Sequence, residues 1–417
     1  MEKLKIHSGH KLTGRIDICS SKNAILPLLA GSVLCDGVVI LNKIPNFSDI
    51  NKMCEILQSV GANITKQGDI LQIDGRVCDK FLISNELGRN LRASILLLGA
   101  LLSKFRFGVV GYPGGCNIGA RPIDLTINGL KSLGVKIVEQ HGYLYCDGKN
   151  MKPNTIKFEK ISVGATENLM LASVFLKGKT VLKNVAKEPE IVDLANFLNS
   201  MGAKICGAGT SQITIYGVES LHSTQYTPIA DRIIAGTYMV AVAMTGGNVE
   251  ICNINPFHLK SITKKLAVCG CNIDIKNDKI KVSANDRCRA LRSITTSTYP
   301  KFPTDMQSAF LSLQTVSKGK CVITENLFEG RFKQVPELIK MGADIKVVCN
   351  MATVKGVNKL SGADVVATDL RAGASLVLCG LVADGYTTVY DIKHIDRGYD
   401  HIETDLSKLG ADIVRIN

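Results

Sequence analysis

The segment YPGGCNIGARPIDL, from Tyr112 to Leu125, combines residue types that can carry out chemistry. Its two prolines and three glycines disfavour a helix or a strand, so the sequence predicts a mobile loop here. The loop carries Cys116 and, five residues later, Arg121. A guanidinium close to a thiol favours the thiolate, so Cys116 could act as a nucleophile or an acid. The alternative interpretation is a free cysteine in an ordinary loop.

Charged residues also stand where apolar helices are expected to begin. Lys22 and Arg371 each open such a stretch, and the N-terminus of a helix favours anions. Asp305 and Asp369 immediately precede apolar helices, where a carboxylate can cap the backbone N–H groups. Capping and catalysis can coexist, so both interpretations of these carboxylates stay open.

A short signature recurs six times along the chain, at intervals of 68 to 73 residues. The copies are LQSVGANI from Leu57, LKSLGVKI from Leu130, LNSMGAKI from Leu198, LAVCGCNI from Leu266, LIKMGADI from Leu338 and LSKLGADI from Leu406. Each copy reads as an amphipathic helix that ends at glycine, the residue favoured at the left-handed position after a helix. Each therefore predicts a helix followed by a strand.

A second, nearly all-apolar helix precedes each signature, for example KNAILPLLAGSVL and RASILLLGALL. A helix that is apolar on every side is buried on every side. Each of these stretches is followed by a glycine turn and a strand. The sequence therefore predicts an α/β protein in which several repeats surround their buried helices with sheet.

The two ends of the chain are expected to meet. Only seven residues follow the last signature glycine, Gly410, too few to complete a sixth repeat. We expect the N-terminal segment KLKIHSG…RIDIC to complete it, which divides the repeats three and three. The first domain would comprise residues 22–229, and the second residues 1–21 plus 230–417. Chain crossings near residues 20–22 and 227–231 would form a hinge, and the cleft between the domains is the default binding site.

Composition excludes several classes of protein. Hydrophobic residues make up 46% of the chain, so it is not disordered, and no apolar run reaches the roughly 20 residues of a membrane span. The N-terminus has no signal-peptide core, and the fourteen cysteines form no disulfide or zinc pattern. We therefore expect a cytoplasmic chain with no bound metal. The net charge of +13 favours an anionic partner.

Seven long segments are similar to signature segments of the UDP-N-acetylglucosamine enolpyruvyl transferases, in the EPSP synthase superfamily. They are SSKNAILPLLA, PGGCNIGARPIDL, KISVGATENLMLA, AKEPEIVDLANFL, FPTDMQSAF, ATDLRAGASL and HIDRGYDHIE. The resemblance runs from end to end. It implies two inside-out, barrel-like α/β domains, each of three βαβαββ repeats. It also implies transfer of enolpyruvyl from phosphoenolpyruvate to the 3′-hydroxyl of UDP-N-acetylglucosamine, without a cofactor, as the first committed step of peptidoglycan synthesis.

The resemblance assigns roles to individual residues. It implies that Cys116 is the general acid and Asp305 the base, and that Asp369 lines the reacting centre. Lys22, Arg121 and Arg397 match the cations around phosphoenolpyruvate.

The remaining residues match substrate contacts of the family. The implied contacts to the two substrates are Asn23, Arg92, Pro122, Ile123, Asp124, Leu125, Lys160, Ser162, Val163, Gly164, Leu327 and Arg371. Thr126 and Ala230 depart from residues that some relatives have, and the pair Glu188 and Glu190 has no role beyond lining the cleft.

Two other functions remain to be distinguished. The sister enzyme that acts on shikimate 3-phosphate has the same fold and chemistry, but it needs neither the loop cysteine nor the RPIDL and KISVGA segments. A basic, non-catalytic scaffold or nucleic-acid binder would show a contiguous basic stripe. No such stripe is evident, so we expect no nucleic acid, membrane or obligate protein partner. No phosphate-binding loop or dinucleotide fingerprint is found either.

Overall fold

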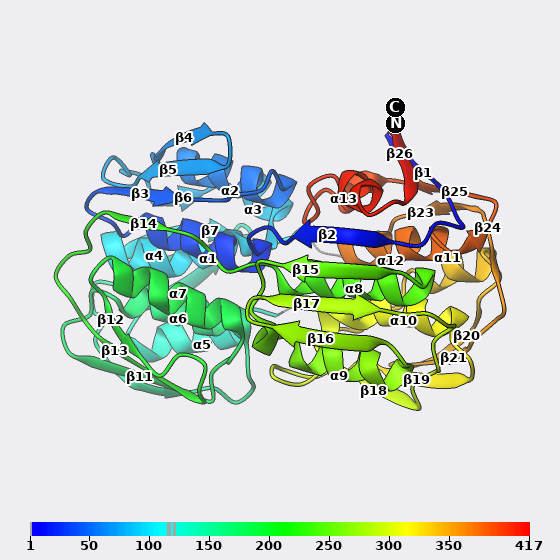
Figure 1. The fold of residues 1–417 in the computed structure, drawn as a ribbon. Coiled ribbons are helices and arrows are strands. Elements are labelled where there is room, and N and C mark those ends of the chain that lie inside the picture. Colours follow the sequence, from blue (N-terminus) through cyan, green and yellow to red (C-terminus); the bar gives the residue numbers. More distant parts are fainter. Residues whose placement is uncertain (1, 115–117, 120–121) are drawn as a thin grey trace. The chain divides into compact units, whose positions relative to one another are not determined.

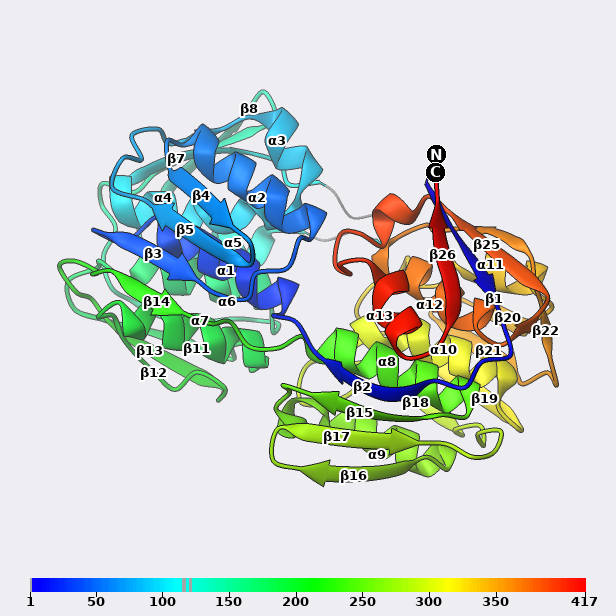
Figure 2. The same cartoon turned by 45° about the horizontal axis from the view of Figure 1, so that its top comes forward.

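The computed structural model describes residues 2–114, 118–119 and 122–417, whose contacts divide them into two compact units (Figures 1 and 2). Unit 1 contains residues 2–19, 118–119 and 230–417, and unit 2 contains residues 20–114 and 122–229. The short segment 118–119 was not expected to group with unit 1. It stays a prediction that residues 22–229 form one domain and that residues 1–21 plus 230–417 form the other.

Unit 2 consists of three βαβαββ repeats in the described residues. The first contains β14 (Thr224–Tyr226), α1 (Lys22–Ser32), β3 (Val38–Leu41), α2 (Ser48–Ser59), β4 (Asn63–Gln67) and β5 (Ile70–Asp74). The second contains β6 (Leu82–Ile83), α3 (Asn85–Asn90), the 3-10 helix η1 (Arg92–Ile95), α4 (Leu96–Phe105), β7 (Phe107–Gly111), α5 (Asp124–Ser132), β8 (Lys136–Gln140) and β9 (Tyr143–Asp147). The third contains β10 (Thr155–Lys157), α6 (Val163–Ser173), β11 (Lys179–Lys183), α7 (Pro189–Ser200), β12 (Lys204–Cys206) and β13 (Gln212–Tyr216).

Unit 1 repeats the same plan in the residues described. The first repeat contains β2 (Thr13–Asp17), α8 (Arg232–Thr245), β15 (Asn248–Cys252), η2 (Pro256–Leu259), α9 (Lys260–Cys269), β16 (Asn272–Lys276) and β17 (Lys279–Ser283). The second contains β18 (Ser293–Thr295), η3 (Thr304–Met306), α10 (Gln307–Val316), β19 (Lys320–Thr324), α11 (Val335–Lys340), β20 (Asp344–Val348) and β21 (Met351–Lys355). The third contains β23 (Asp364–Val366), α12 (Leu370–Gly380), β25 (Tyr386–Tyr390), η4 (Ile392–His394), α13 (Ile402–Lys408), β26 (Asp412–Ile416) and β1 (Lys3–His7), and β22 (Leu360–Ser361) pairs separately with β24 (Ala383–Asp384).

Each repeat forms one four-stranded sheet with the same strand order. In the third repeat of unit 2, β10 is parallel to β11, and β13 is antiparallel to both β11 and β12. A helical crossover joins parallel strands, whereas a short hairpin joins antiparallel ones. The six signature glycines end the outer helices with φ between +88° and +104°, as predicted.

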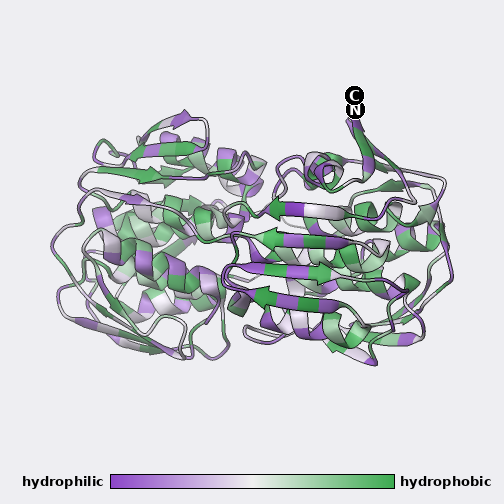
Figure 3. Ribbon diagram, in the orientation of Figure 1, coloured by the Kyte–Doolittle hydropathy of each residue, from purple (hydrophilic) through white to green (hydrophobic). Residues whose placement is uncertain are grey.

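One helix of every repeat lies in the interior. In unit 2 these helices are α1, α4 and α6, and in unit 1 they are α8, α10 and α12. Every residue of α12 is buried. Helices α4 and α6 approach so closely that a Cβ on Gly99 would lie 2.3 Å from the carbonyl oxygen of Asn168. Figure 3 shows hydrophobic and hydrophilic residues alternating along β15, β17 and β16, whose sheet covers α8. The prediction of buried helices surrounded by sheet is confirmed.

Strands distant in the sequence complete both units. In unit 1, β1 pairs antiparallel with β25 and β26, so it completes the last repeat. The following strand, β2, was assigned to that repeat too, and this was wrong, because β2 pairs in parallel with β15 in the sheet of the first repeat of unit 1. In unit 2, β14 returns to pair in parallel with β3.

The two chain crossings are hydrogen-bonded. Within unit 2, the backbone N–H of Ser21 donates to Ile229 (2.7 Å), and within unit 1 that of Asp231 donates to Cys19 (2.9 Å). The Asp193 carboxylate accepts from the Tyr226 hydroxyl at 2.7 Å and from the N–H of Ile229 at 3.3 Å. Burial raises the pKa of Asp193 to about 6. Among the described residues, no helix is long and apolar enough to cross a membrane.

Candidate active site

Asp305 lies at the centre of a group of buried charges in unit 1. Its carboxylate forms an ion pair with Arg331 and another with Arg371, whose Nη2 lies 3.2 Å from Oδ2. The two arginine side chains are 4% and 6% exposed, whereas the Asp305 side chain is 23% exposed. Two buried cations therefore fix the orientation of a carboxylate that solvent can still reach. Arg331 was not predicted from the sequence, because its partner Asp305 lies elsewhere in the chain.

Arg371 remains charged although its side chain is buried. Burial opposes the charged form, but Asp305, Tyr399 and Asp231 outweigh it and raise the Arg371 pKa above its usual value. Its guanidinium carbon also lies 5.9 Å from the centre of the Tyr399 ring. A permanent positive charge is thus held at the start of α12.

Asp369 and Asp305 differ in whether they cap the helix that follows them. Asp369 is the N-cap of α12, because its Oδ1 accepts hydrogen bonds from the N–H groups of Arg371 (2.9 Å) and Ala372 (3.1 Å). The capping interpretation is therefore confirmed for Asp369. It is wrong for Asp305, because the N-cap of η3 is Pro303 and no side chain caps that helix.

The charges of Asp369 and Arg397 both act on His394, which lies in η4. Burial lowers the pKa of His394, and Lys393 and Arg397 lower it further, whereas Asp391 and Asp369 oppose the shift. The imidazole is therefore near enough to both predicted site residues for their charges to shift its pKa. Arg397 itself is half-buried in the turn after η4. His394 was not predicted from the sequence.

Glu325 organises the loop that carries Leu327. Its Oε1 accepts from the backbone N–H of Leu327 at 2.8 Å and from that of Phe328 at 3.2 Å. Its Oε2 accepts from the hydroxyl of Thr304, the residue before Asp305, at 2.9 Å. One buried carboxylate thus positions both the Leu327 loop and the turn that bears Asp305.

The predicted loop from residue 112 to 125 is only partly described. Cys116 and Arg121 lie outside the described residues. Within unit 1, the carbonyl of Ile118 accepts a hydrogen bond of 2.8 Å from Gly330, the residue before Arg331. A Cβ on Gly330 would lie 2.7 Å from the Ile118 backbone, and one on Gly119 would lie 2.3 Å from Glu329 Oε2. The backbone-to-backbone contact favours glycine at position 330, whereas at position 119 it is the φ of +128° that favours glycine. The loop is also shorter than expected, because α5 begins at Asp124, so Asp124 and Leu125 are helical.

Lys22 is the first residue of α1 in unit 2. Its Nζ lies 3.1 Å from Oδ2 of Asp49, and the two side chains are 12% and 2% exposed. Asp49 belongs to the first turn of α2, and it was not singled out from the sequence. The ammonium group is thus held in a fixed place beside Asn23, the next residue of α1.

The N-terminus of α6 presents backbone N–H groups next to small side chains. The Ser162 hydroxyl caps this helix by accepting from Ala165 N–H at 3.3 Å. Val163 and Gly164 form its first turn, Val163 is 37% exposed, and no atom lies within 4 Å of a Cβ placed on Gly164. Lys160 is exposed just before it. A helix start with this much open space suits an anionic group.

The other predicted residues of unit 2 lie at separate places in that unit. Arg92 opens η1, and its Nη1 donates to the Pro113 carbonyl at 3.4 Å. Pro122 is exposed, and Ile123 is the residue before α5. Glu188 precedes α7, and Glu190 is buried in its first turn. The structure brings Asp305, Asp369 and Arg371 together, and it links Leu327 to them through Glu325.

Substituting Gly330 tests whether the Ile118 contact matters for activity. We expect Gly330→Ala to fold and to lose about tenfold or more in kcat, because a displacement of about 1 Å near reacting groups is costly. The measurement is steady-state turnover, with the melting temperature recorded alongside. Unchanged turnover in a folded variant would show that residues 118–119 need not dock here.

The chain is similar to enolpyruvyl transferases over its whole length. The sequence model of the family described as EPSP synthase (3-phosphoshikimate 1-carboxyvinyltransferase) matches residues 6–406. UDP-N-acetylglucosamine 1-carboxyvinyltransferase 2 of Caldanaerobacter subterraneus subsp. tengcongensis is 46% identical over 416 residues, with 100% of both chains covered. UDP-N-acetylglucosamine 1-carboxyvinyltransferase of Geobacter metallireducens is 47% identical with the same coverage.

Solved structures agree with this relationship. The enolpyruvyl transferase NikO from Streptomyces tendae has a TM-score of 0.88 at 25% identity, covering 99% of this chain and 98% of NikO. EPSP synthase from Acinetobacter baumannii has a TM-score of 0.78 at 16% identity, covering 100% of both chains, and this likeness shows the fold alone. The chain therefore belongs to the EPSP synthase family and, within it, to the group of proteins named UDP-N-acetylglucosamine 1-carboxyvinyltransferase.

Proposed function

We propose that this chain transfers the enolpyruvyl group of phosphoenolpyruvate to the 3′-hydroxyl of UDP-N-acetylglucosamine and releases phosphate. The observation that carries the proposal is identity of 46% to 47% over the full length of proteins named for this reaction. The reaction is the first committed step of peptidoglycan synthesis. We place it in the cytoplasm, because the thirteen cysteines among the described residues are all free thiols, as in a reducing compartment.

Several cations are available for phosphoenolpyruvate, which carries a phosphate and a carboxylate. Lys22, Arg121 and Arg397 are the proposed contacts, with Arg371 as a companion. The Lys22 ammonium is fixed by Asp49 and the Arg371 guanidinium by Asp305. Cations fixed before the substrate arrives lose little side-chain entropy on binding, which favours tight recognition of a small anion.

The proposed reaction is an addition followed by an elimination. A proton adds to C3 of phosphoenolpyruvate, C2 becomes electrophilic, and the sugar hydroxyl oxygen forms a bond to C2. Asp305 takes the hydroxyl proton, and a tetrahedral phosphoketal results. Loss of a proton from C3 then restores the double bond as the C2–O bond to phosphate breaks. Cys116 is the proposed acid at C3, and Asp369 is proposed to line the same centre.

The arrangement around Asp305 supports its role as the base. Its carboxylate is more exposed than the two arginines that hold it. Arg331 and Arg371 therefore act as positioning residues for the oxygen that meets the hydroxyl proton. Glu325 adds to this by anchoring Thr304, the residue before Asp305.

The nucleotide sugar is proposed to bind through two groups of residues. Arg121, Pro122, Ile123, Asp124 and Leu125 would contact the uracil, and Lys160, Ser162, Val163 and Gly164 the uridine and diphosphate. The open start of α6 supports the second assignment, because helix N-termini favour phosphate. Asn23, Arg92 and Leu327 are further proposed substrate contacts.

A two-substrate assay tests the function directly. Purified protein should release phosphate from phosphoenolpyruvate when UDP-N-acetylglucosamine is added. Shikimate 3-phosphate, the substrate of the sister enzyme, is the parallel control and should give only background. Phosphate release with shikimate 3-phosphate, and none with the nucleotide sugar, would overturn the proposal.

Replacement of the proposed base, Asp305, tests its role in the reaction. Asp305→Asn should fold and lose about a hundredfold or more in kcat, because an amide cannot accept the hydroxyl proton. Asp344→Asn, at an exposed carboxylate in β20 of the same unit, is the matched control and should retain turnover. Near-normal turnover of Asp305→Asn would show that Asp305 is not the base and can only contribute to substrate binding.

The third prediction concerns Cys116. Fosfomycin, an epoxide that resembles phosphoenolpyruvate, should alkylate this thiol, and UDP-N-acetylglucosamine should speed the reaction. Mass spectrometry should find one adduct, on the peptide containing Cys116. Cys116→Ser should abolish it, whereas Cys206→Ser and Cys349→Ser, which remove two exposed thiols, should not.

Cys116→Asp should keep turnover and resist the epoxide, because a carboxylic acid still donates a proton. An adduct elsewhere, or full activity of Cys116→Ala, would remove Cys116 from the mechanism.

A further inference from the structure

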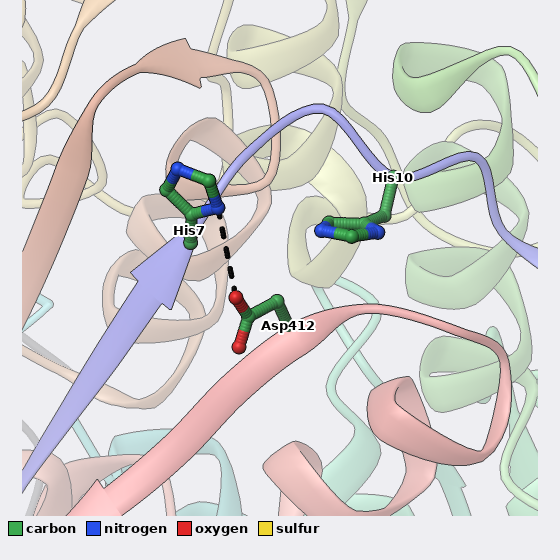
Figure 4. A group of neighbouring side chains, drawn as sticks. All are labelled: His7, His10 and Asp412. Atoms are coloured by element: carbon green, nitrogen blue, oxygen red, sulfur yellow. Dashed lines mark ion pairs between the residues drawn. The ribbon is translucent and has the colours of Figure 1, made fainter.

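Two histidines and an aspartate converge at the edge of unit 1. His7 ends β1 and Asp412 begins β26, and these two residues lie opposite each other in the antiparallel pair. His7 Nδ1 lies 3.6 Å from Asp412 Oδ2, and His10 brings a third side chain to the same place (Figure 4). One ligand atom from each residue lies within 4.8 Å of those of the other two.

The backbone holds this arrangement in place. Gly9, with φ of +100°, turns the chain between the two histidines. Leu12 is fully buried, and the N–H of Thr13 donates to the carbonyl of Leu409 at 2.8 Å. The segment after β1 is therefore fixed to the turn that precedes Asp412. His10 is exposed and has room to adjust its rotamer.

The donor set suits a divalent transition metal. Two imidazole nitrogens and one carboxylate oxygen are typical ligands of Zn²⁺ and of similar ions, with bonds of about 2.0–2.2 Å. Tetrahedral bonds of that length separate the ligand atoms by about 3.4 Å. Side-chain rotation at three partly or fully exposed residues can supply the remaining movement. The Tyr386 ring lies 4.7 Å from that of His7, centre to centre, and restrains its orientation.

We propose that His7, His10 and Asp412 form a binding site for a divalent transition metal, with water completing the coordination. No metal site was predicted from the sequence, because Asp412 lies about 400 residues from the histidines. Metal would join the segment after the first strand to the start of the last one. Since the unfolded chain separates these ligands, binding favours the folded form.

Zinc titration of the untagged, chelator-treated protein tests the proposal. Isothermal titration calorimetry should detect one Zn²⁺ ion whose affinity falls about tenfold or more in His7→Gln and in His10→Gln. Saturating Zn²⁺ should raise the melting temperature of the parent protein but not of these variants. With Co²⁺ in place of Zn²⁺, the parent should show visible absorption bands of a four-coordinate site.

Two control variants separate this site from other ligands. His222→Gln removes an exposed histidine of unit 2, and Cys206→Ser removes an exposed thiol. Both should bind Zn²⁺ as the parent does. The proposal is overturned if the parent does not bind Zn²⁺, or if His7→Gln and His10→Gln bind it as tightly as the parent. His10→Gln lies outside β1, so it keeps the test valid if His7→Gln weakens the sheet.

Discussion

The need to enclose helices that are apolar on every side dominates this structure. A single repeat cannot bury its inner helix, so three repeats combine in each unit. The sheets cover the apolar helix surfaces that would otherwise contact water. Polar side chains in the middle of such a helix are buried against its neighbours, so the ends are where it can present polar groups to solvent. The candidate residues of each unit follow this rule. Lys22, Arg92 and the Ser162 turn in unit 2 lie at or just before the N-termini of inner helices, and so do Asp305 and the Asp369 cap in unit 1.

Burying charge at those helix ends makes each charged group depend on its neighbours. Arg371 contributes its N–H to the Asp369 cap and its guanidinium to Asp305, while Arg331 holds the same carboxylate from another loop. Removing one member of such a group leaves a buried charge without compensation, which costs more than the pair contributes. The geometry of Asp305 is therefore a property of the whole group.

Local signals in the sequence were enough to predict much of this fold. The six glycines, the outer helices and the apolar inner helices follow from short-range rules about helix ends and burial. Pairings between distant segments were harder to predict. β2 was assigned to the wrong sheet because its sequence does not specify a partner, and Arg331, Glu325 and Asp49 were missed because each acts through a side chain elsewhere in the chain. The roles assigned to Cys116 and Arg121 rest on the residue types of their loop and on the family resemblance, because both lie outside the described residues.

The pairing of β1 with β26 has a consequence for synthesis on the ribosome. Unit 2 is nearly continuous in sequence, and its last strand, β14, ends at Tyr226. In unit 1 Lys3 lies opposite Ile416, so the sheet that contains β1 cannot be completed until residue 416 has left the exit tunnel. Until then β1 lacks its neighbour β26, so the growing chain carries an incompletely paired strand while the roughly 400 intervening residues are made.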